Sequence, residues 1–407
     1  MSKYQLVCKK CGKVIGTAKD WFENDQLCTC GSNYATVEYF SDYAKLNELL
    51  KAEKVSNFYH YKDFLPIEND SQIFSLNEGA VDIQEWSFLE KEAKEHNIDC
   101  RVLVVRNDQN GGTGTFKDIA ASLAATMFKE NGVTDYCLAS TGNTATAYST
   151  YLAKAGIKFH LFAPCDMYPD SINAIKATGQ EIIISKGNYG AAKKEAAEFH
   201  KANNVMISAG NIDPIRVEAK KTLVFECIRQ LGQMPTVYMQ AVAGGTSPIA
   251  FNKGMDELHK IMPECKMPRM LLVQQDTCDP MVQAWEWAVE NRFPEGYQEH
   301  YPSITPTTKI SILSAGTPGM YPIVAPIVKK SNGSFVRIKE EQVVRYGYET
   351  KKETGICFGP ASVVCIAGFH QAVKDGLIKN GDTVLLNIGE GSGRAAWFRD
   401  AVENYNE

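Results

Sequence analysis

Residues 111–118 read Gly-Gly-Thr-Gly-Thr-Phe-Lys-Asp and lie between an apolar run that predicts a strand and a segment that predicts a helix. Glycine-rich turns that open helices expose backbone N–H groups at the positive end of the helix dipole, which suits a bound anion. Three roles are open to Lys117: it could hold a phosphate, carry a structural charge or act as a nucleophile. Other segments of the sequence are needed to choose among these three roles.

Length and charge limit what the chain can be. At 407 residues it is too long for one small core, so we expect two domains and a small appendage. The hydrophobic content of 44% and the charged content of 22% are those of an ordinary soluble globular protein. A formal net charge of −5 offers no broad attraction for nucleic acid or an anionic membrane. The sequence shows no membrane-spanning stretch and no apolar signal core, so we expect a cytoplasmic protein.

Apolar, β-branched runs alternate with helix-forming segments along most of the chain. The runs are nearly continuous, which is typical of strands buried on both faces of a parallel sheet. Their alternation with helical segments predicts an α/β fold with helices on both faces of the sheet. The predicted strands are residues 101–105, 135–139, 159–162, 181–184, 205–208, 236–240, 269–273, 309–313 and 383–387.

Four predicted strand ends carry glycines and small hydroxyl side chains, at residues 111–118, 139–147, 240–248 and 387–394. Ligands bind at such carboxyl ends in open parallel sheets. Common nucleotide and metal motifs do not fit, because the sequence lacks a Gly-Lys-Ser/Thr ending, a Gly-x-Gly-x-x-Gly after a first strand and a His-Glu-x-x-His. A lysine facing several anion-binding loops suits a phosphorylated aldehyde cofactor, to which it would bind as a Schiff base.

Each of these features also has a plain structural explanation. A lysine beside a loop is most often a solvated surface charge. Asn143 could merely cap a helix, and Gly244-Gly245 could merely form a tight turn. What favours the cofactor is a set of motifs that occur together.

Five motifs resemble those of the threonine synthase family of fold type II pyridoxal phosphate (PLP) enzymes, and they occur in family order. Thr115-Phe-Lys-Asp resembles the Ser-Phe-Lys-Asp of that family, and Ser140-Thr-Gly-Asn-Thr resembles its loop for the substrate carboxylate and the cofactor ring hydroxyl. Residues 75–79, 211–218 and 359–362 are similar to its Ser-Leu-Gly-Glu-Gly, Asn-x-x-Pro-x-Arg-x-Glu and Glu-Pro-Ala-Ser segments. The resemblance implies a PLP enzyme over most of the chain.

Three further segments are closer to cysteate synthases, which are relatives of the threonine synthases. Residues 240–246 resemble their phosphate loop, and residues 280–285 and 383–391 resemble two of their later segments. Threonine synthases carry Leu-Thr-Gly-x-Gly at the last position, with the threonine facing the pyridine nitrogen. This chain has no threonine there, so either Glu390 or Ser392 could face the nitrogen, and a carboxylate would keep that nitrogen protonated.

The resemblance implies a β-replacement that converts O-phospho-L-serine and sulfite to L-cysteate and phosphate. The alternative is threonine synthase, which converts O-phospho-L-homoserine and water to L-threonine and phosphate. A β-replacement with another thiol or amine nucleophile is the third. All three predict a small-molecule substrate, and a homodimer is compatible with each.

The resemblance also implies a role for each residue of the predicted site. Lys117 would hold the cofactor and then act as the base at the substrate Cα, which requires a lowered pKa that burial would supply. Asn143 would bond the ring hydroxyl of the cofactor. The cofactor phosphate would be held by Gly244, Gly245, Thr246 and Ser247, and the substrate carboxylate by Ser140, Thr141 and Thr144.

We therefore expect a tryptophan synthase β-like fold with two parallel-sheet domains and a zinc-ribbon-like segment at residues 1–38. The large PLP domain would combine residues 39–125 with residues 222–407, and a small α/β domain would occupy residues 126–221.

Four of the twelve cysteines lie near the start of the chain, at Cys8, Cys11, Cys28 and Cys30. Their pairing resembles a zinc ribbon with two knuckles, because four thiolates suit tetrahedral zinc. Archaeal-type threonine synthases begin with a similar pattern. We expect the cysteines to hold structural zinc, and the alternative is a vestigial knuckle without metal. A ribbon that binds nucleic acid or protein is the rival hypothesis, but the segment is only mildly basic and has no arginine, so we expect no nucleic acid.

Overall fold

The computed structural model describes residues 2–406, which form three sheets. The largest has the order β12-β11-β10-β13-β5-β4, in which β4 is antiparallel to β5 and all other neighbours are parallel. Its strands are β4 (Ile83–Glu85), β5 (Arg101–Arg106), β10 (Val237–Ala241), β11 (Arg269–Gln275), β12 (Ser334–Ile338) and β13 (Thr383–Ile388).

A second, smaller sheet is parallel throughout and has the order β8-β7-β6-β9. Its strands are β6 (Asp135–Ala139), β7 (Lys158–Ala163), β8 (Glu181–Ile184) and β9 (Met206–Ile207). The third sheet is antiparallel, has the order β2-β1-β3 and consists of β1 (Tyr4–Cys8), β2 (Val14–Gly16) and β3 (Ala35–Tyr39).

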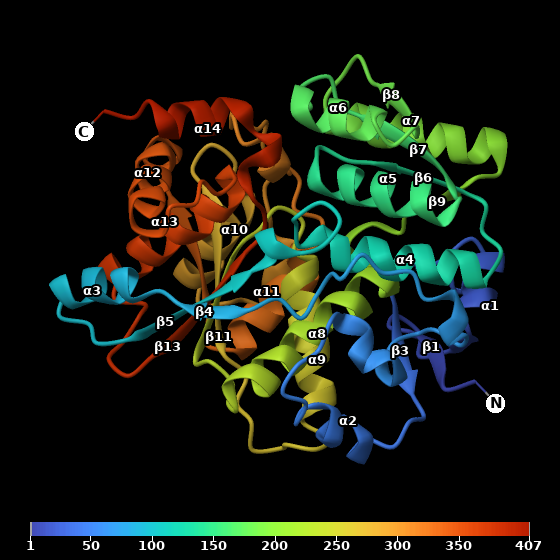
Figure 1. Ribbon diagram of the computed structural model, residues 1–407, viewed down its shortest axis with the longest axis horizontal. Coiled ribbons are helices and arrows are strands. Elements are labelled where there is room, and N and C mark those ends of the chain that lie inside the picture. Colours follow the sequence, from blue (N-terminus) through green and yellow to red (C-terminus); the bar gives the residue numbers. More distant parts are fainter. Residues whose placement is uncertain (1, 407) are drawn as a thin grey trace.

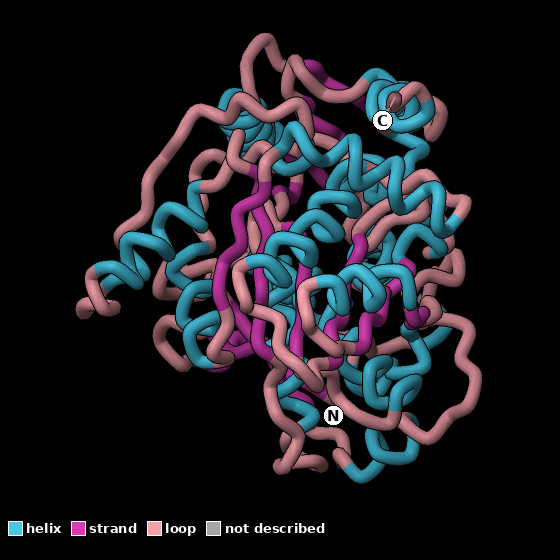
Figure 2. Tube along the Cα trace, turned by 90° about the vertical axis from the view of Figure 1, so that its left-hand side faces the viewer, coloured by secondary structure: helices cyan, strands magenta, loops and turns pink. Residues whose placement is uncertain are grey.

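Helices cover both faces of the large sheet, as Figure 2 shows. The first seven are α1 (Ala18–Glu23), α2 (Ala44–Leu49), α3 (Ser87–Glu95), α4 (Lys117–Glu130), α5 (Asn143–Ala155), α6 (Pro169–Lys176) and α7 (Tyr189–Asn203). The others are α8 (Pro214–Leu231), α9 (Thr246–Leu258), α10 (Pro280–Glu290), α11 (Tyr321–Lys330), α12 (Val343–Thr354), α13 (Pro360–Lys374) and α14 (Ala396–Glu403).

The strand sequences explain this layering. On β5, Val102 and Val104 pack into a core shared with α3 and α13, whereas Leu103 and Val105 pack into a core shared with α4, α8 and α9. Successive side chains of a strand point to opposite faces, so a strand covered on both faces must be apolar at every position. The predicted α/β architecture with helices on both faces is therefore confirmed.

The three sheets occupy different regions of the molecule (Figure 1). The small sheet with α5, α6 and α7 lies at the upper right of that view, and the antiparallel sheet lies near the N-terminus at the lower right. All strands of the small sheet lie within the predicted residues 126–221, although α8 runs through residue 221. The domain boundaries remain a prediction.

The predicted strand at residues 309–313 is wrong, because Ser311–Leu313 form a 3₁₀ helix. Ile310 and Leu313 are both buried in the core shared with α13, and a spacing of three residues brings side chains to one side of a helical turn, not of a strand. The strand β12 was not predicted. It is an edge strand in which the buried Phe335 and Val336 lie among half-buried polar residues.

None of the helices in residues 2–406 is long and apolar enough to cross a membrane.

Candidate active site

A cavity opens at the carboxyl ends of β6, β10 and β13, the position at which parallel sheets bind ligands. It brings together segments that are distant in the sequence: the starts of α4, α5 and α9, the first turns of α8, and the turn after β13. Ten of the eleven residues predicted for the cofactor and substrate lie on its wall: Lys117, Ser140, Thr141, Asn143, Thr144, Gly244, Gly245, Thr246, Ser247 and Glu390. Ser392 does not line it.

The glycine turn before α4 wraps around Asp118. The buried carboxylate of Asp118 accepts the backbone N–H groups of Thr113 (3.1 Å) and Thr115 (2.8 Å) and the Thr113 hydroxyl (2.6 Å). Gly111 approaches another loop so closely that a Cβ there would lie 1.7 Å from the carbonyl oxygen of Leu76. The turn therefore uses amide donors to hold Asp118, which argues against a phosphate clamp at this place.

Lys117 is the first residue of α4, and its amine faces the cavity. Within residues 2–406 no hydrogen bond or ion pair joins its Nζ, which lies 5.5 Å from the centre of the Phe116 ring. Burial lowers the pKa of Lys117 to about 8, with the carboxylate of Glu390 acting against the shift and the cation of Arg216 adding to it. An amine with this pKa is partly neutral near physiological pH and can act as a nucleophile or a base.

The turn before α5 presents amide and hydroxyl groups to the cavity. Gly142 is the N-cap residue, and Ser140 Oγ accepts the backbone N–H groups of Gly142 (3.3 Å) and Ala145 (3.2 Å). Asn143 therefore does not cap the helix. Its side-chain amide donates to the Glu390 carboxylate, and its side-chain oxygen accepts from Arg394 Nε (3.2 Å).

The turn before α9 is built for close approach. A Cβ at Gly244 would lie 2.0 Å from Nδ2 of Asn211, and Gly245 has a φ of +85°, which favours glycine. Thr246 Oγ1 donates to the Asn211 side-chain oxygen at 3.0 Å. The first N–H groups of a helix have no partner within it, so this turn offers donors to a bound anion at the positive end of the helix dipole.

These observations fit PLP. The turn before α9 would hold the cofactor phosphate through the backbone of residues 244–247, and Lys117 is the amine that would bind the aldehyde.

Of the two residues predicted to face the pyridine nitrogen of the cofactor, Glu390 and Ser392, only Glu390 lines the cavity. Its buried carboxylate accepts hydrogen bonds from the side-chain amide of Asn143 and from the backbone N–H of Ala361 (3.0 Å). Burial raises the pKa of Glu390. A Cβ at residue 359 would lie 2.6 Å from the carboxyl carbon of Glu390. The family motif that residues 359–362 resemble carries a glutamate at the position of Gly359. Because Gly359 has no side chain, the side chain of Glu390 can occupy that space.

Several residues of the cavity wall were not predicted from the sequence, among them Tyr148, Tyr189, Arg216, Lys220 and Asn387. Arg216 was part of a recognised motif but received no role. Lys220 lies four residues after Arg216 on α8, and this spacing, which places two side chains on one face of a helix, was the signal that could have identified it.

The chain belongs to the family of pyridoxal-phosphate dependent enzymes, whose sequence profile matches residues 82–389. Among its relatives is a threonine synthase of Methanocaldococcus jannaschii, which is 27% identical over 391 residues, or 94% of this chain and 91% of that protein. A threonine synthase of Methanosarcina acetivorans is 24% identical over 94% of this chain and 90% of its own length. The protein is a PLP-dependent, threonine synthase-like enzyme.

Solved structures confirm the predicted fold type II class. Diaminopropionate ammonia lyase of Escherichia coli aligns with a TM-score of 0.64 and 15% identity over 99% of this chain and 97% of that chain. A cysteine synthase of Entamoeba histolytica aligns with a TM-score of 0.63 and 19% identity over 81% of this chain and 90% of that chain.

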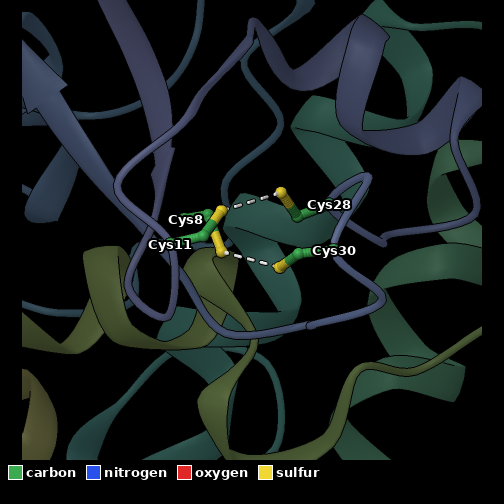
Figure 3. A group of neighbouring side chains, drawn as sticks. All are labelled: Cys8, Cys11, Cys28 and Cys30. Carbon is green, nitrogen blue, oxygen red and sulfur yellow. Dashed lines mark hydrogen bonds between the residues drawn. The ribbon is translucent and has the colours of Figure 1, made fainter.

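The four N-terminal cysteines converge, as Figure 3 shows. Their sulfur atoms all lie within 4.8 Å of one another, with 3.6 Å between Cys8 and Cys30 and between Cys11 and Cys28. Zinc–sulfur bonds of about 2.3 Å in a tetrahedron separate the sulfur atoms by about 3.8 Å, so this donor set fits structural zinc. Within residues 2–406, no other group of three or more His, Cys, Asp or Glu residues could hold a metal ion.

Proposed function

We propose that this enzyme converts O-phospho-L-homoserine and water to L-threonine and phosphate. The relatives that carry the name threonine synthase support this proposal, because they match over more than nine tenths of the chain. They favour this reaction over the cysteate synthesis that the sequence motifs indicated first.

The observation that carries the proposal is a single cavity that combines a partly neutral lysine with separate sites for several anions. The substrate carboxylate would bind the turn at Ser140, Thr141 and Thr144, and the cofactor phosphate would bind the turn before α9. Arg216, which is 9% exposed, adds a fixed cation on α8, where a second phosphate could be held.

When phosphate leaves from Cγ of phosphohomoserine, Cβ must also lose a proton, and threonine then forms as water adds to Cβ and a proton is delivered to Cγ. When bound, PLP would withdraw electrons from the substrate, which would make the α-proton acidic. Lys117 would accept that proton at Nζ, since its pKa of about 8 leaves a useful fraction of neutral amine near pH 7. Asn143 and Glu390 would orient the ring through their buried hydrogen bond. The cations would hold the leaving phosphate away from the attacking water.

Isotope-labelled water tests the proposal. Purified enzyme with PLP and O-phospho-L-homoserine in H₂¹⁸O should form threonine and phosphate in equal amounts, with the label in the threonine hydroxyl. In this reaction the carbon–oxygen bond to phosphate breaks and water adds to carbon, so phosphate should stay unlabelled. Label in the phosphate, with homoserine as the product, would show a phosphatase and contradict the proposal. The Lys117→Ala variant is the control.

Cysteate synthase is the second candidate. It is favoured by residues 387–391 at the end of β13, Asn-Ile-Gly-Glu-Gly, which lack the threonine of threonine synthases and resemble the cysteate synthase sequence. The same assay with O-phospho-L-serine, with and without sulfite, separates the two. Cysteate that forms only with sulfite, together with no threonine from phosphohomoserine, would replace the first proposal by the second.

A further inference from the structure

The cavity is lined by a second lysine, Lys220, which has no role in the proposed reaction. Lys220 lies on α8, one turn after Arg216, and both line the cavity. Lys220 is 4% exposed, so its amine is almost wholly removed from water. It also shares an aromatic neighbour with Lys117, since its Nζ lies 4.9 Å from the centre of the Phe116 ring.

Lys220 has no anionic partner in the protein. Within residues 2–406, no hydrogen bond or ion pair joins its ammonium group. The next residue, Lys221, is as deeply buried but is paired with Glu218 and with Glu257 (2.7 Å). Arg216 donates to Ser208 Oγ (2.8 Å). A buried amine is costly to protonate without a counter-charge, so Lys220 is the unsatisfied member of this group.

The surroundings of Lys220 disfavour its charged form unless an anion binds beside it. Burial lowers the pKa of Lys220 well below its ordinary value, and the cations of Lys117 and Arg216 lower it further, with Asp213 acting in the opposite direction. The carboxylate of Asp213 is held by the backbone N–H of Ile215 (2.9 Å) and lies 3.9 Å from Arg216. A dianion that enters the cavity would supply the charge that the protein does not.

Each of the other anions of the reaction has its own position. The cofactor phosphate belongs to the turn before α9 and the substrate carboxylate to the turn before α5, whereas Lys220 and Arg216 project from α8. We propose that Lys220 is a substrate-binding residue that, together with Arg216, holds the phosphate group of the phosphoamino acid. This inference rests on the proposed function, because it takes the substrate to be a phosphate ester.

Inorganic phosphate is a direct probe of this site, because bound PLP fills the other phosphate position. Titration calorimetry on PLP-loaded enzyme should show that Lys220→Gln weakens phosphate binding by about tenfold or more, as expected for the loss of a charge-assisted hydrogen bond. Lys220→Arg should retain most of the affinity, because it keeps the charge. Lys194→Gln, which changes an exposed lysine on α7, is the control and should bind as the wild type does.

A second readout separates substrate binding from a merely structural role. Lys220→Gln should raise KM for the phosphoamino acid much more than it lowers kcat, while its PLP content and melting temperature stay close to those of the wild type. Unchanged phosphate affinity in Lys220→Gln would overturn the proposal. Loss of PLP with phosphate affinity intact would also overturn it, because Lys220 would then serve the cofactor.

The same data distinguish failure of this inference from failure of the proposed function. If the wild-type enzyme forms no threonine, and Lys220→Gln nevertheless binds phosphate more weakly than the wild type, the proposed reaction is refuted and the anion site is supported. Wild-type enzyme that forms threonine, with Lys220→Gln unchanged in KM and in phosphate affinity, would refute the anion site alone.

Discussion

Lys117 combines two properties that a surface lysine lacks. Its position at the first residue of α4 is fixed by the turn around Asp118, and its amine faces the cavity without a partner among residues 2–406. Burial then favours the neutral form of the amine. The glycines of the turn serve the backbone geometry, so the chemistry of residues 111–118 lies in the lysine.

The pH dependence of cofactor loading follows from the pKa of Lys117. Because this pKa is lowered to about 8, the amine is mainly protonated below that pH and mainly neutral above it. Only the neutral amine is a nucleophile. The rate of PLP uptake by the cofactor-free protein, followed by absorbance, should therefore rise as pH increases through about 8 and then level off. A rate that still rises steeply near pH 10 would indicate a lysine with an ordinary pKa.

The sequence predicted individual residues of the cavity wall where they belonged to a recognisable motif. Lys117, Asn143 and Gly244 each belonged to such a motif, and all three lie on one cavity wall. Lys220 was not predicted, because a lysine inside a helix is ordinarily solvated, and its spacing of four residues from Arg216 does not by itself indicate burial.

The turn before α9 depends on the absence of side chains. Gly244→Ala would place a methyl group 2.0 Å from Nδ2 of Asn211, which must then move together with its bond to Thr246. Overpacking of this kind costs about 1–3 kcal/mol, so we expect PLP to bind about tenfold more weakly or worse.

Fluorescence titration of PLP measures this effect. Gly319→Ala is the matched control, since a Cβ at that glycine meets nothing within 4 Å. Equal PLP affinity in Gly244→Ala and in the wild type would argue against a cofactor phosphate at this turn.

The four N-terminal cysteines form one candidate metal site, with Cys8 at the end of β1 and the other three in the connections between the strands. Elemental analysis of the purified protein should find about one zinc ion per chain, as for a four-cysteine structural site. Cys11→Ser and Cys30→Ser should each lose the metal and lower the melting temperature. Cys165→Ser, which alters an exposed cysteine outside the cluster, should keep it. Full zinc content in Cys11→Ser would refute this ligand set.

The elements that were predicted wrongly share a physical cause. Residues 309–313 and 334–338 both carry apolar side chains, but only the second segment pairs with a neighbouring strand, β11. Whether an apolar segment becomes a strand depends on hydrogen bonds to segments that are distant in the sequence, and the periodicity of a single sequence does not reveal those partners.

A buried ionic network joins the N-terminal sheet to α8 and α9. Tyr39 of β3 donates to Glu218 at 2.7 Å, and Lys221 bonds both Glu218 and Glu257, which lie on α8 and α9. All three charged side chains are at most 1% exposed. The network therefore ties together segments that are about 180 residues apart.

Breaking this network should destabilise the whole molecule. Lys221→Ala removes the cation that bonds both carboxylates and leaves them only Lys253, which lies 2.8 Å from Glu257 and 3.9 Å from Glu218. We therefore expect the free energy of unfolding to fall by about 3 kcal/mol in denaturant titrations. Lys194→Ala, which removes a lysine that is 80% exposed, should change it by less than about 0.5 kcal/mol. Similar values for the two variants would show that the network contributes little.

The cavity itself is a property of the whole molecule. Its wall combines residues from 117 to 390, and their convergence depends on how the two parallel sheets and α8 pack. Motif order predicted which segments would meet. The distances between them, and the burial that shifts the pKa of Lys117, arise only from the folded packing.

The most direct test is to locate the cofactor. Two lysines, Lys117 and Lys220, line the cavity, and only Lys117 should bind PLP covalently. Borohydride reduction of the loaded enzyme, followed by digestion and mass spectrometry, should place the added cofactor mass on the peptide that contains Lys117 and leave Lys220 unmodified. Cofactor attached to Lys220, or to any lysine outside the cavity, would contradict the account.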